Sequence, residues 1–216
     1  MRPRIKICCI SSIQEARLAI SYGASALGLV GPMPSGPGVI DNDTIHSIAR
    51  ATPPAVHSFL LTSETTASQI IHHHGLTRTT TIQLVDSISP DQYAIIRHAL
   101  PGVKLVQVIH VLNDATVDEA LALAPEVDAL LLDSGNPNLA VKELGGTGRV
   151  HNWDLSASIV RQSPVPVFLA GGLHAGNVQE AIERVQPFGL DLCSGVRSEG
   201  KLHHGKLEAF FRAAGY

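Results

Sequence analysis

Short apolar segments alternate with longer amphipathic segments along the whole chain. A short apolar run bounded by turn residues predicts a buried strand, and apolar positions three to four residues apart predict a helix. Strands are predicted over residues 5–10, 26–30, 55–62, 80–85, 104–111, 129–133, 167–170 and 190–193. Helices are predicted over residues 12–22, 43–51, 65–74, 90–100, 116–123, 177–185 and 206–213, with one more between the loop of residues 134–152 and the strand that starts at residue 167.

These elements form eight strand and helix pairs, which predict a parallel sheet because each helix returns the chain to the same end of the sheet. Eight parallel strands can close into a (β/α)8 TIM barrel. The alternative is a doubly wound open sheet, which normally carries a G-x-G-x-x-G motif after its first strand. This chain has Cys8-Cys9-Ile10-Ser11-Ser12 there, which favours the barrel. No shift in composition marks a linker, so residues 1–216 are predicted to form one α/β domain.

Local signals mark where the first helix begins and ends. Ser12 and Glu15 have the spacing of a capping box, in which the two residues satisfy the free backbone N–H groups of a helix start. Gly23 follows the amphipathic segment, at a position where a helix often ends with a residue of positive φ.

Composition and charge exclude several classes of protein. The 216 residues carry 16 basic and 19 acidic side chains, a formal net charge of -3, which predicts no binding to nucleic acid or to an anionic membrane. Three cysteines, two of them adjacent, make no disulfide framework and favour a reducing, cytoplasmic compartment. We expect neither a signal peptide nor a membrane span, because the apolar runs are too short.

Candidate chemistry lies at the carboxyl ends of the strands, where barrels of this kind build their active sites. Cys8 ends the first predicted strand and Asp133 ends the sixth. A thiol and a carboxyl group on opposite sides of a barrel mouth are suited to general base and general acid catalysis. The alternatives are an inert buried cysteine and a carboxylate that only caps a helix or orders a loop.

Three glycine groups follow the last three strands: Gly145-Gly146-Thr147-Gly148, Gly171-Gly172 and Ser194-Gly195. Bare backbone N–H groups at such positions can bind a phosphate, and this fold often binds phosphate near its seventh and eighth strands. A single group would be explained equally well as a tight turn. The occurrence of three favours a phosphate site.

The histidines raise the question of a metal site or of further polar contacts at the barrel mouth. His72, His73 and His74 are consecutive on a predicted helix and point in different directions, so a solvated helix end is favoured over a metal site. His110 and His151 are candidates for polar contacts at the barrel mouth or for structural roles. No cysteine and histidine spacing supports zinc, and no metal site is predicted.

The ordered set of motifs resembles the phosphoribosylanthranilate isomerase family from end to end. The motifs are Lys6-Ile7-Cys8, Leu132-Asp133-Ser134, Gly145-Gly146-Thr147-Gly148, Leu169-Ala170-Gly171-Gly172-Leu173 and Asp191 with Ser194-Gly195-Val196. The resemblance implies an Amadori rearrangement of a phosphoribosyl amine in tryptophan biosynthesis, without a cofactor. It implies that Cys8 is the general base and Asp133 the general acid. It also implies a substrate-binding set: Lys6, Gln83, Gly146, Gly148, Gly171, Gly172, Asp191, Ser194 and Gly195.

The chain departs from this family where the family binds the aromatic acid of its substrate. Gly38 stands where the family has an arginine that pairs with the anthranilate carboxylate, and Cys9 stands where the family has glycine. Asp86 replaces a rim glycine, and Arg197 replaces a glutamate. Loss of a charged partner for a carboxylate commonly costs several kcal/mol. We therefore expect weak activity on phosphoribosylanthranilate, with Arg197 either the substitute cation or a solvated loop residue.

The resemblance therefore implies an aldose to ketose isomerase of the phosphoribosylanthranilate isomerase type, acting on a small phosphorylated sugar amine. One alternative is a paralogous isomerase for a different sugar phosphate. Another is a noncatalytic phosphate-ligand sensor, which would require neither Cys8 nor Asp133. A monomer or a homodimer is expected.

Overall fold

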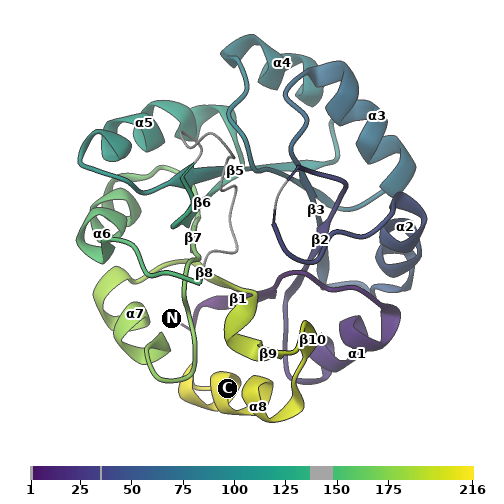
Figure 1. The fold of residues 1–216 in the computed structure, drawn as a ribbon. Coiled ribbons are helices and arrows are strands. Elements are labelled where there is room, and N and C mark those ends of the chain that lie inside the picture. The colour runs from purple at the N-terminus through teal and green to yellow at the C-terminus, as the bar shows by residue number, and fades with distance from the viewer. Residues whose placement is uncertain (1, 35, 137–147) are drawn as a thin grey trace.

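Eight parallel strands close into a barrel in the computed structural model, which describes residues 2–34, 36–136 and 148–216. The strands follow chain order around the barrel, and β1 closes it by pairing with both β2 and β8 (Figure 1). They are β1 Arg4–Ile7, β2 Ala26–Val30, β3 His57–Thr62, β4 Thr81–Leu84, β5 Lys104–His110, β6 Ala129–Asp133, β7 Val167–Leu169 and β8 Gly189–Leu192. The single (β/α)8 barrel predicted from the sequence is confirmed.

A ring of eight α-helices surrounds the barrel in the described part of the chain, one after each strand (Figure 1). They are α1 Ile13–Ser21, α2 Asn42–Ala51, α3 Ala67–Thr77, α4 Pro90–Ala99, α5 Ala115–Leu123, α6 Trp153–Gln162, α7 Val178–Val185 and α8 His204–Ala213. Short 3-10 turns lie at η1 Ala124–Glu126 and η2 Ser194–Val196.

The structure agrees with the sequence signals for the start and end of α1, with one difference. The Ser12 hydroxyl accepts a hydrogen bond from the Glu15 N–H at 3.1 Å, and Gly23 has φ +105° just after α1. The Glu15 carboxylate, however, accepts from the N–H of Ser11 at 3.0 Å, one residue before the position of a capping box. Its other partners, Arg197 and Leu202, lie far along the chain.

Three features of the local structure differ from what the sequence predicts. The first strand ends at Ile7 and does not run to residue 10. A small antiparallel hairpin, β9 Arg197–Ser198 and β10 Lys201–Leu202, lies between β8 and α8, where no strand was predicted. His73 and His74 are not on a solvated helix end, because both are buried. The His73 ring contacts Thr62 Oγ1 at 2.9 Å, and the His74 ring contacts the Thr79 carbonyl at 2.8 Å. Burial lowers the pKa of His73, which favours its neutral form.

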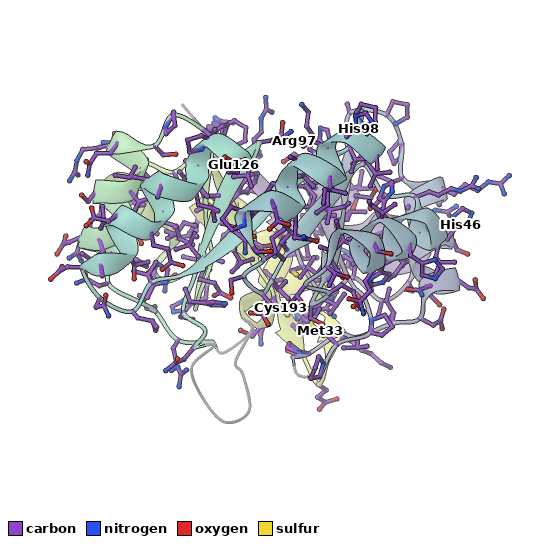
Figure 2. The ribbon with its side chains drawn as sticks, turned by 90° about the horizontal axis from the view of Figure 1, so that it is seen from above. Met33, His46, Arg97, His98, Glu126 and Cys193 are labelled. Atoms are coloured by element: carbon purple, nitrogen blue, oxygen red, sulfur yellow. The ribbon has the colours of Figure 1, made fainter. Side chains whose placement is uncertain are left out.

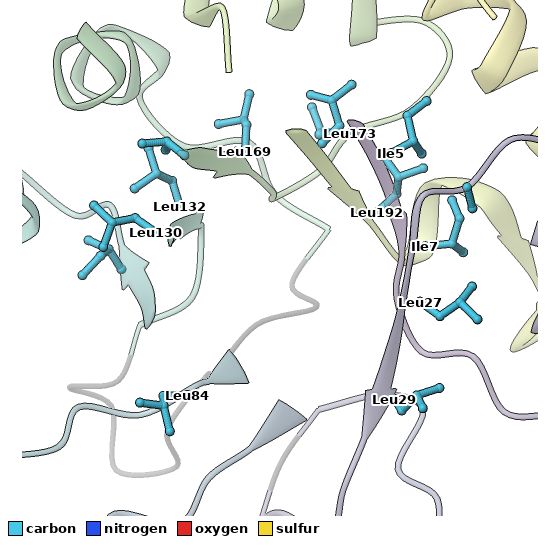
Figure 3. Packing of buried hydrophobic residues seen from close by; sticks show 14 of the residues in the cluster. Ile5, Ile7, Leu27, Leu29, Leu84, Leu130, Leu132, Leu169, Leu173 and Leu192 are labelled. Atoms are coloured by element: carbon cyan, nitrogen blue, oxygen red, sulfur yellow. The ribbon is translucent and has the colours of Figure 1, made fainter. Parts of the chain in front are cut away.

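Two layers of core follow from the alternation of side chains along each strand. Apolar side chains that point outward pack under the helices, among them Ile5, Leu27, Leu130 and Leu192 (Figure 3). Side chains that point inward form a second cluster inside the barrel, which includes Phe59, Val106, Leu131 and Phe168. Burying a leucine or isoleucine side chain stabilises a fold by about 1.5–3 kcal/mol, so the outer layer is a main source of stability.

Within the described residues, no helix has the length and apolar character needed to cross a membrane.

Candidate active site

A cavity of ≈ 70 Å³ opens at the carboxyl ends of the strands. Predicted site residues that line it are Cys8, Gln83, Asp133, Gly148, Gly171, Gly172, Asp191 and Ser194. Met33 and Cys193, which also line it, lie close together at this end of the barrel, away from Arg97 and Glu126 on the outer surface (Figure 2). A larger hollow of ≈ 580 Å³, lined by Arg4, His57 and Phe188 among others, contains no predicted site residue.

Cys8 lies where β1 ends and the chain turns toward α1. Its N–H donates to the Leu192 carbonyl at 2.7 Å, and the next residue, Cys9, has φ +62°. The thiol faces Gly28 of β2, where an added Cβ would lie 2.7 Å from Cys8 Sγ. Gly28 was not predicted as a site residue, although glycine inside a strand is a signal of close approach. Its missing side chain leaves the room that the thiol occupies.

Asp133 lies at the end of β6, on the other side of the cavity. One carboxylate oxygen accepts a hydrogen bond from the Ser134 N–H at 2.8 Å, and the residue is buried. Burial is the largest influence on its pKa and raises it above the ordinary value, against the smaller opposing effects of Ser134 and His110. His110 is its register neighbour on β5 and does not line the cavity. A carboxyl group held toward its protonated form is suited to general acid catalysis.

Lys6 and Asp191 form an ion pair inside the barrel. They are register neighbours on β1 and β8, and Lys6 Nζ lies 2.8 Å from Asp191 Oδ2. Burial acts to lower the pKa of Lys6, but the charges of Asp191 and of the nearby thiols raise it overall, so the ammonium stays charged. Lys6 itself does not line the cavity. It holds Asp191, which does.

Two buried acceptors on the cavity wall have no hydrogen-bond partner within the described parts of the chain. They are Gln83 Oε1 and Asp191 Oδ1. A buried acceptor without a donor costs free energy, so such atoms are expected to face a ligand or water. Their positions suit the hydroxyl groups of a sugar.

The wall directly after β7 contains two glycines and is called the glycine wall. Gly171 and Gly172 have φ +81° and +64°, and a Cβ on Gly172 would lie 2.7 Å from the Arg149 carbonyl carbon. Gly195 does not line the cavity, and a Cβ there would lie 2.0 Å from the Leu173 carbonyl oxygen. Gly146 lies outside the described residues. Close packing therefore explains why positions 171, 172 and 195 are glycine.

The Cys9 side chain explains the glycine at position 38. Gly38 has φ +77°, and an added Cβ would lie 2.5 Å from Cys9 Cβ. Cys9 Sγ also lies 3.6 Å from the Pro37 carbonyl oxygen. The two departures at positions 9 and 38 are thus coupled, because the side chain at one position fills the space required by the other.

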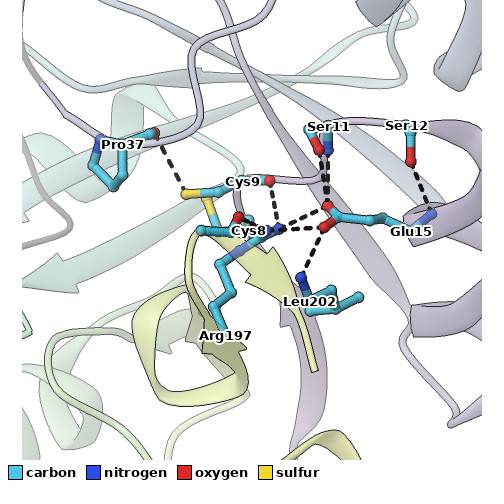
Figure 4. A network of polar contacts seen from close by, with 9 residues as sticks. Cys8, Cys9, Ser11, Ser12, Glu15, Pro37, Arg197 and Leu202 are labelled. Atoms are coloured by element: carbon cyan, nitrogen blue, oxygen red, sulfur yellow. Dashed lines mark hydrogen bonds and ion pairs between the residues drawn. The ribbon is translucent and has the colours of Figure 1, made fainter. Parts of the chain in front are cut away.

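The structure does not support the expectation that Arg197 supplies a cation to the substrate. Arg197 does not line the cavity, and its side chain is 9% exposed, so it is not a solvated loop residue either. Its guanidinium donates to Glu15 and to the carbonyl groups of Cys8 and Cys9 (Figure 4). No local pattern in the sequence indicates the Glu15 partner, which is 182 residues away.

His151 lies beside the glycine wall and not on the cavity. Its Nε2 contacts Ser156 Oγ at 2.7 Å, and burial lowers its pKa to about 4, so the ring is neutral at neutral pH. No group of three or more metal-ligating side chains lies together in the part of the chain that the structure describes.

The fold and the cavity define a class: a (β/α)8 barrel with a thiol and a carboxyl group facing one cavity, in the arrangement of an acid–base enzyme. Residues 5–213 match the family model of N-(5'-phosphoribosyl)anthranilate isomerase. The chain belongs to this family.

Individual relatives agree with this assignment. The isomerase of Methanocella arvoryzae is 34% identical over 196 residues, which cover 91% of this chain and 90% of that protein. The solved isomerase of Pyrococcus furiosus superposes with a TM-score of 0.82 at 26% identity, covering 98% of each chain. A further solved isomerase, in complex with reduced 1-(o-carboxyphenylamino)-1-deoxyribulose 5-phosphate, has a TM-score of 0.80 at 23% identity over 98% of each chain and shows the same fold.

Proposed function

We propose that the chain converts N-(5'-phosphoribosyl)anthranilate to 1-(o-carboxyphenylamino)-1-deoxyribulose 5-phosphate, an aldose to ketose rearrangement of tryptophan biosynthesis. The observation that carries this proposal is the pair of Cys8 and Asp133, which line one cavity from β1 and β6 beside a glycine wall. The reaction opens the furanose ring and transfers protons with no net oxidation or reduction of the molecule, so it needs no cofactor.

In this proposal Asp133 donates a proton and Cys8 accepts one. Asp133, whose pKa is raised by burial, donates a proton to the furanose oxygen as the ring opens. Cys8, as a thiolate, accepts the proton from C2 of the sugar, and the resulting enamine becomes the ketose by tautomerisation. One proton leaves Asp133 and one is accepted by Cys8, so the summed charge of the two side chains does not change. Transfer of a proton from Cys8 to Asp133 through solvent then restores the starting form of each group.

The remaining wall supports a sugar phosphate. Gln83 Oε1 and Asp191 Oδ1 are acceptors suited to sugar hydroxyls, and Lys6 fixes Asp191. The backbone around Gly171, Gly172 and Ser194 supplies N–H groups for the phosphate. A solved relative binds an analogue with this same division into phosphate, sugar and aromatic amine.

One observation favours a second candidate. Among the described residues that line the cavity there is no arginine, lysine or histidine to pair with an anthranilate carboxylate. A sugar-phosphate amine without a carboxylate would therefore fit the described wall at least as well. For the anthranilate derivative we expect a high KM.

Direct turnover tests the proposal. Purified protein is assayed with N-(5'-phosphoribosyl)anthranilate prepared in place, and Cys8→Ser and Asp133→Asn are assayed beside it. Loss of an acid or base group costs about 100- to 10,000-fold, so we expect each variant to lose turnover by that factor while retaining phosphate binding. Wild-type rates in either variant would overturn the assigned roles. Failure of the unmodified chain to restore growth of a tryptophan auxotroph that lacks this isomerase would favour the second candidate.

A cytoplasmic location, a small phosphorylated sugar amine as the partner, no nucleic acid, and a monomer or homodimer complete the proposal.

A further inference from the structure

The ion pair of Arg197 and Glu15 contacts the backbone of the segment that carries Cys8. Arg197 Nη2 donates to the Cys8 carbonyl at 3.3 Å and to the Cys9 carbonyl at 2.5 Å. The same guanidinium lies 3.0 and 3.1 Å from the two carboxylate oxygens of Glu15. Arg197 belongs to β9 and Glu15 to α1, so the pair joins the β8–α8 hairpin to the first helix directly behind the thiol (Figure 4).

The pair makes further contacts on its outer side, although Arg197 Nε is buried without a hydrogen-bond partner among the described residues. Glu15 accepts from the Ser11 N–H at 3.0 Å and from the Leu202 N–H at 2.8 Å, and Arg197 Nη1 donates to the Gly200 carbonyl at 2.9 Å. Burial acts against both charges, but their mutual interaction lowers the pKa of Glu15 and raises that of Arg197. Both side chains therefore stay ionised, and neither residue lines the cavity.

The backbone that this pair holds is strained. Cys9 has φ +62°, a left-handed conformation that costs a non-glycine residue free energy. In this conformation the carbonyl groups of Cys8 and Cys9 converge on one nitrogen of Arg197. Without the guanidinium, the carbonyl groups of Cys8 and Cys9 would lose this donor, and the segment would move to reach water.

We propose that Arg197, held by Glu15, is a positioning residue that fixes the backbone of Cys8 so that its thiol is aimed into the cavity. The inference rests on the proposed function, in which Cys8 is the general base. Arg197 touches neither the cavity nor the thiol and acts through the carbonyl groups of Cys8 and Cys9. A displacement of about 1 Å at a reacting group can cost about 100-fold in rate.

The test separates kcat from KM in Arg197→Met, Arg197→Lys and the control Arg212→Met. Arg212 also pairs with a glutamate, Glu208 at 2.9 Å, but on the exposed face of α8. For Arg197→Met we expect kcat to fall by about 100-fold with KM changed by less than about threefold. Lysine retains the charge without the planar fork, so Arg197→Lys should recover about tenfold of that loss. Arg212→Met should match the unmodified chain.

A second measurement follows the thiol directly. The rate at which iodoacetamide alkylates Cys8, read by mass spectrometry of the peptide, should change in Arg197→Met and stay unchanged in Arg212→Met. A KM increase with unchanged kcat would overturn the inference and make Arg197 a substrate cation. A lower melting temperature with unchanged kcat, measured where the variant is folded, would overturn it in favour of a purely structural pair. Cys8→Ser distinguishes failure of the proposed function from failure of the positioning inference. If this variant retains turnover, the proposed role of Cys8 is wrong. If it is inactive and Arg197→Met is not impaired, only the positioning inference is wrong.

Discussion

The two sides of the cavity present different parts of the chain to a ligand. The wall directly after β7 presents backbone and is called the backbone wall, because Gly171 and Gly172 leave no side chain between the main chain and the cavity. The wall after β1 and β2 presents side chains, namely those of Cys8, Cys9 and Met33. A backbone wall recognises a group common to many substrates, such as a phosphate, whereas a side-chain wall changes with each substitution.

The side-chain wall includes Cys9, one of the positions at which the sequence departs from the pattern expected for the family. The Cβ of Cys9 occupies the space that a side chain at position 38 would need, so we expect the two positions to compensate one another. The glycines after β7 tolerate no such exchange, because a Cβ on Gly172 would overlap the backbone of Arg149. The backbone wall is therefore constrained by main-chain packing.

Substitution of the backbone wall should have the largest effect. Gly172→Ala places a Cβ 2.7 Å from the Arg149 carbonyl carbon at φ +64°. We expect a loss of about 2–3 kcal/mol in the free energy of unfolding, from the left-handed conformation and the clash. Loss of a hydrogen bond to a charged group costs about 1.5–3 kcal/mol, so KM should rise by about 10- to 100-fold. Thermal melting and steady-state kinetics measure the two effects.

Gly200→Ala is the matched control. Gly200 has φ +74°, and an added Cβ would meet nothing within 4 Å. This variant carries the same backbone cost without the clash and without a place on the cavity, so its KM should stay unchanged. Equal KM values in the two variants would show that the loop after β7 does not bind the phosphate.

Substitutions at Cys9 and Gly38 should change the free energy of unfolding less, and the effect of one should depend on the other. Gly38→Ala places a Cβ 2.5 Å from Cys9 Cβ, and Cys9→Gly removes that atom. We expect Gly38→Ala to cost about 2 kcal/mol in the unmodified chain and about 1–2 kcal/mol less in the Cys9→Gly background, measured by denaturant unfolding. Gly36→Ala, whose Cβ would meet only Met33 Sδ at 3.9 Å, should add to Cys9→Gly without coupling. If Gly38→Ala costs the same in both backgrounds, the two positions do not compensate one another.

The sequence predicted the barrel and the approximate positions of its strands because both follow from local periodicity, although β1 ends at Ile7 and not at residue 10. Asp133 was placed by the point at which an apolar run stops and Cys8 by its position near the end of the first run, and the structure brings both to one cavity. The hairpin at residues 197–202 was missed because two strands of two residues each carry no periodicity. The partners of Arg197 were missed for the same reason, since the direction of its side chain depends on that hairpin. Contacts such as Cys9 with Gly38 depend on how two loops meet, which no local pattern records.

The smallest effect concerns His151, which lies 3.1 Å from the position of a Cβ on Gly171, behind the backbone wall. Burial lowers the pKa of His151 to about 4, whereas an unfolded histidine titrates near about 6.5. The unfolded chain thus binds a proton first as the pH falls, so the stability contributed by neutral His151 is present above pH 6.5 and is lost toward pH 4. At pH 5.5 the loss is about 1 kcal/mol relative to pH 7.5. His151→Gln should remove this part of the pH dependence of the melting temperature, while His98→Gln, on the exposed face of α4, should leave it intact. If the melting temperatures of the unmodified chain and of His151→Gln fall in parallel between pH 7.5 and 5.5, the backbone wall does not hold His151 in its neutral form.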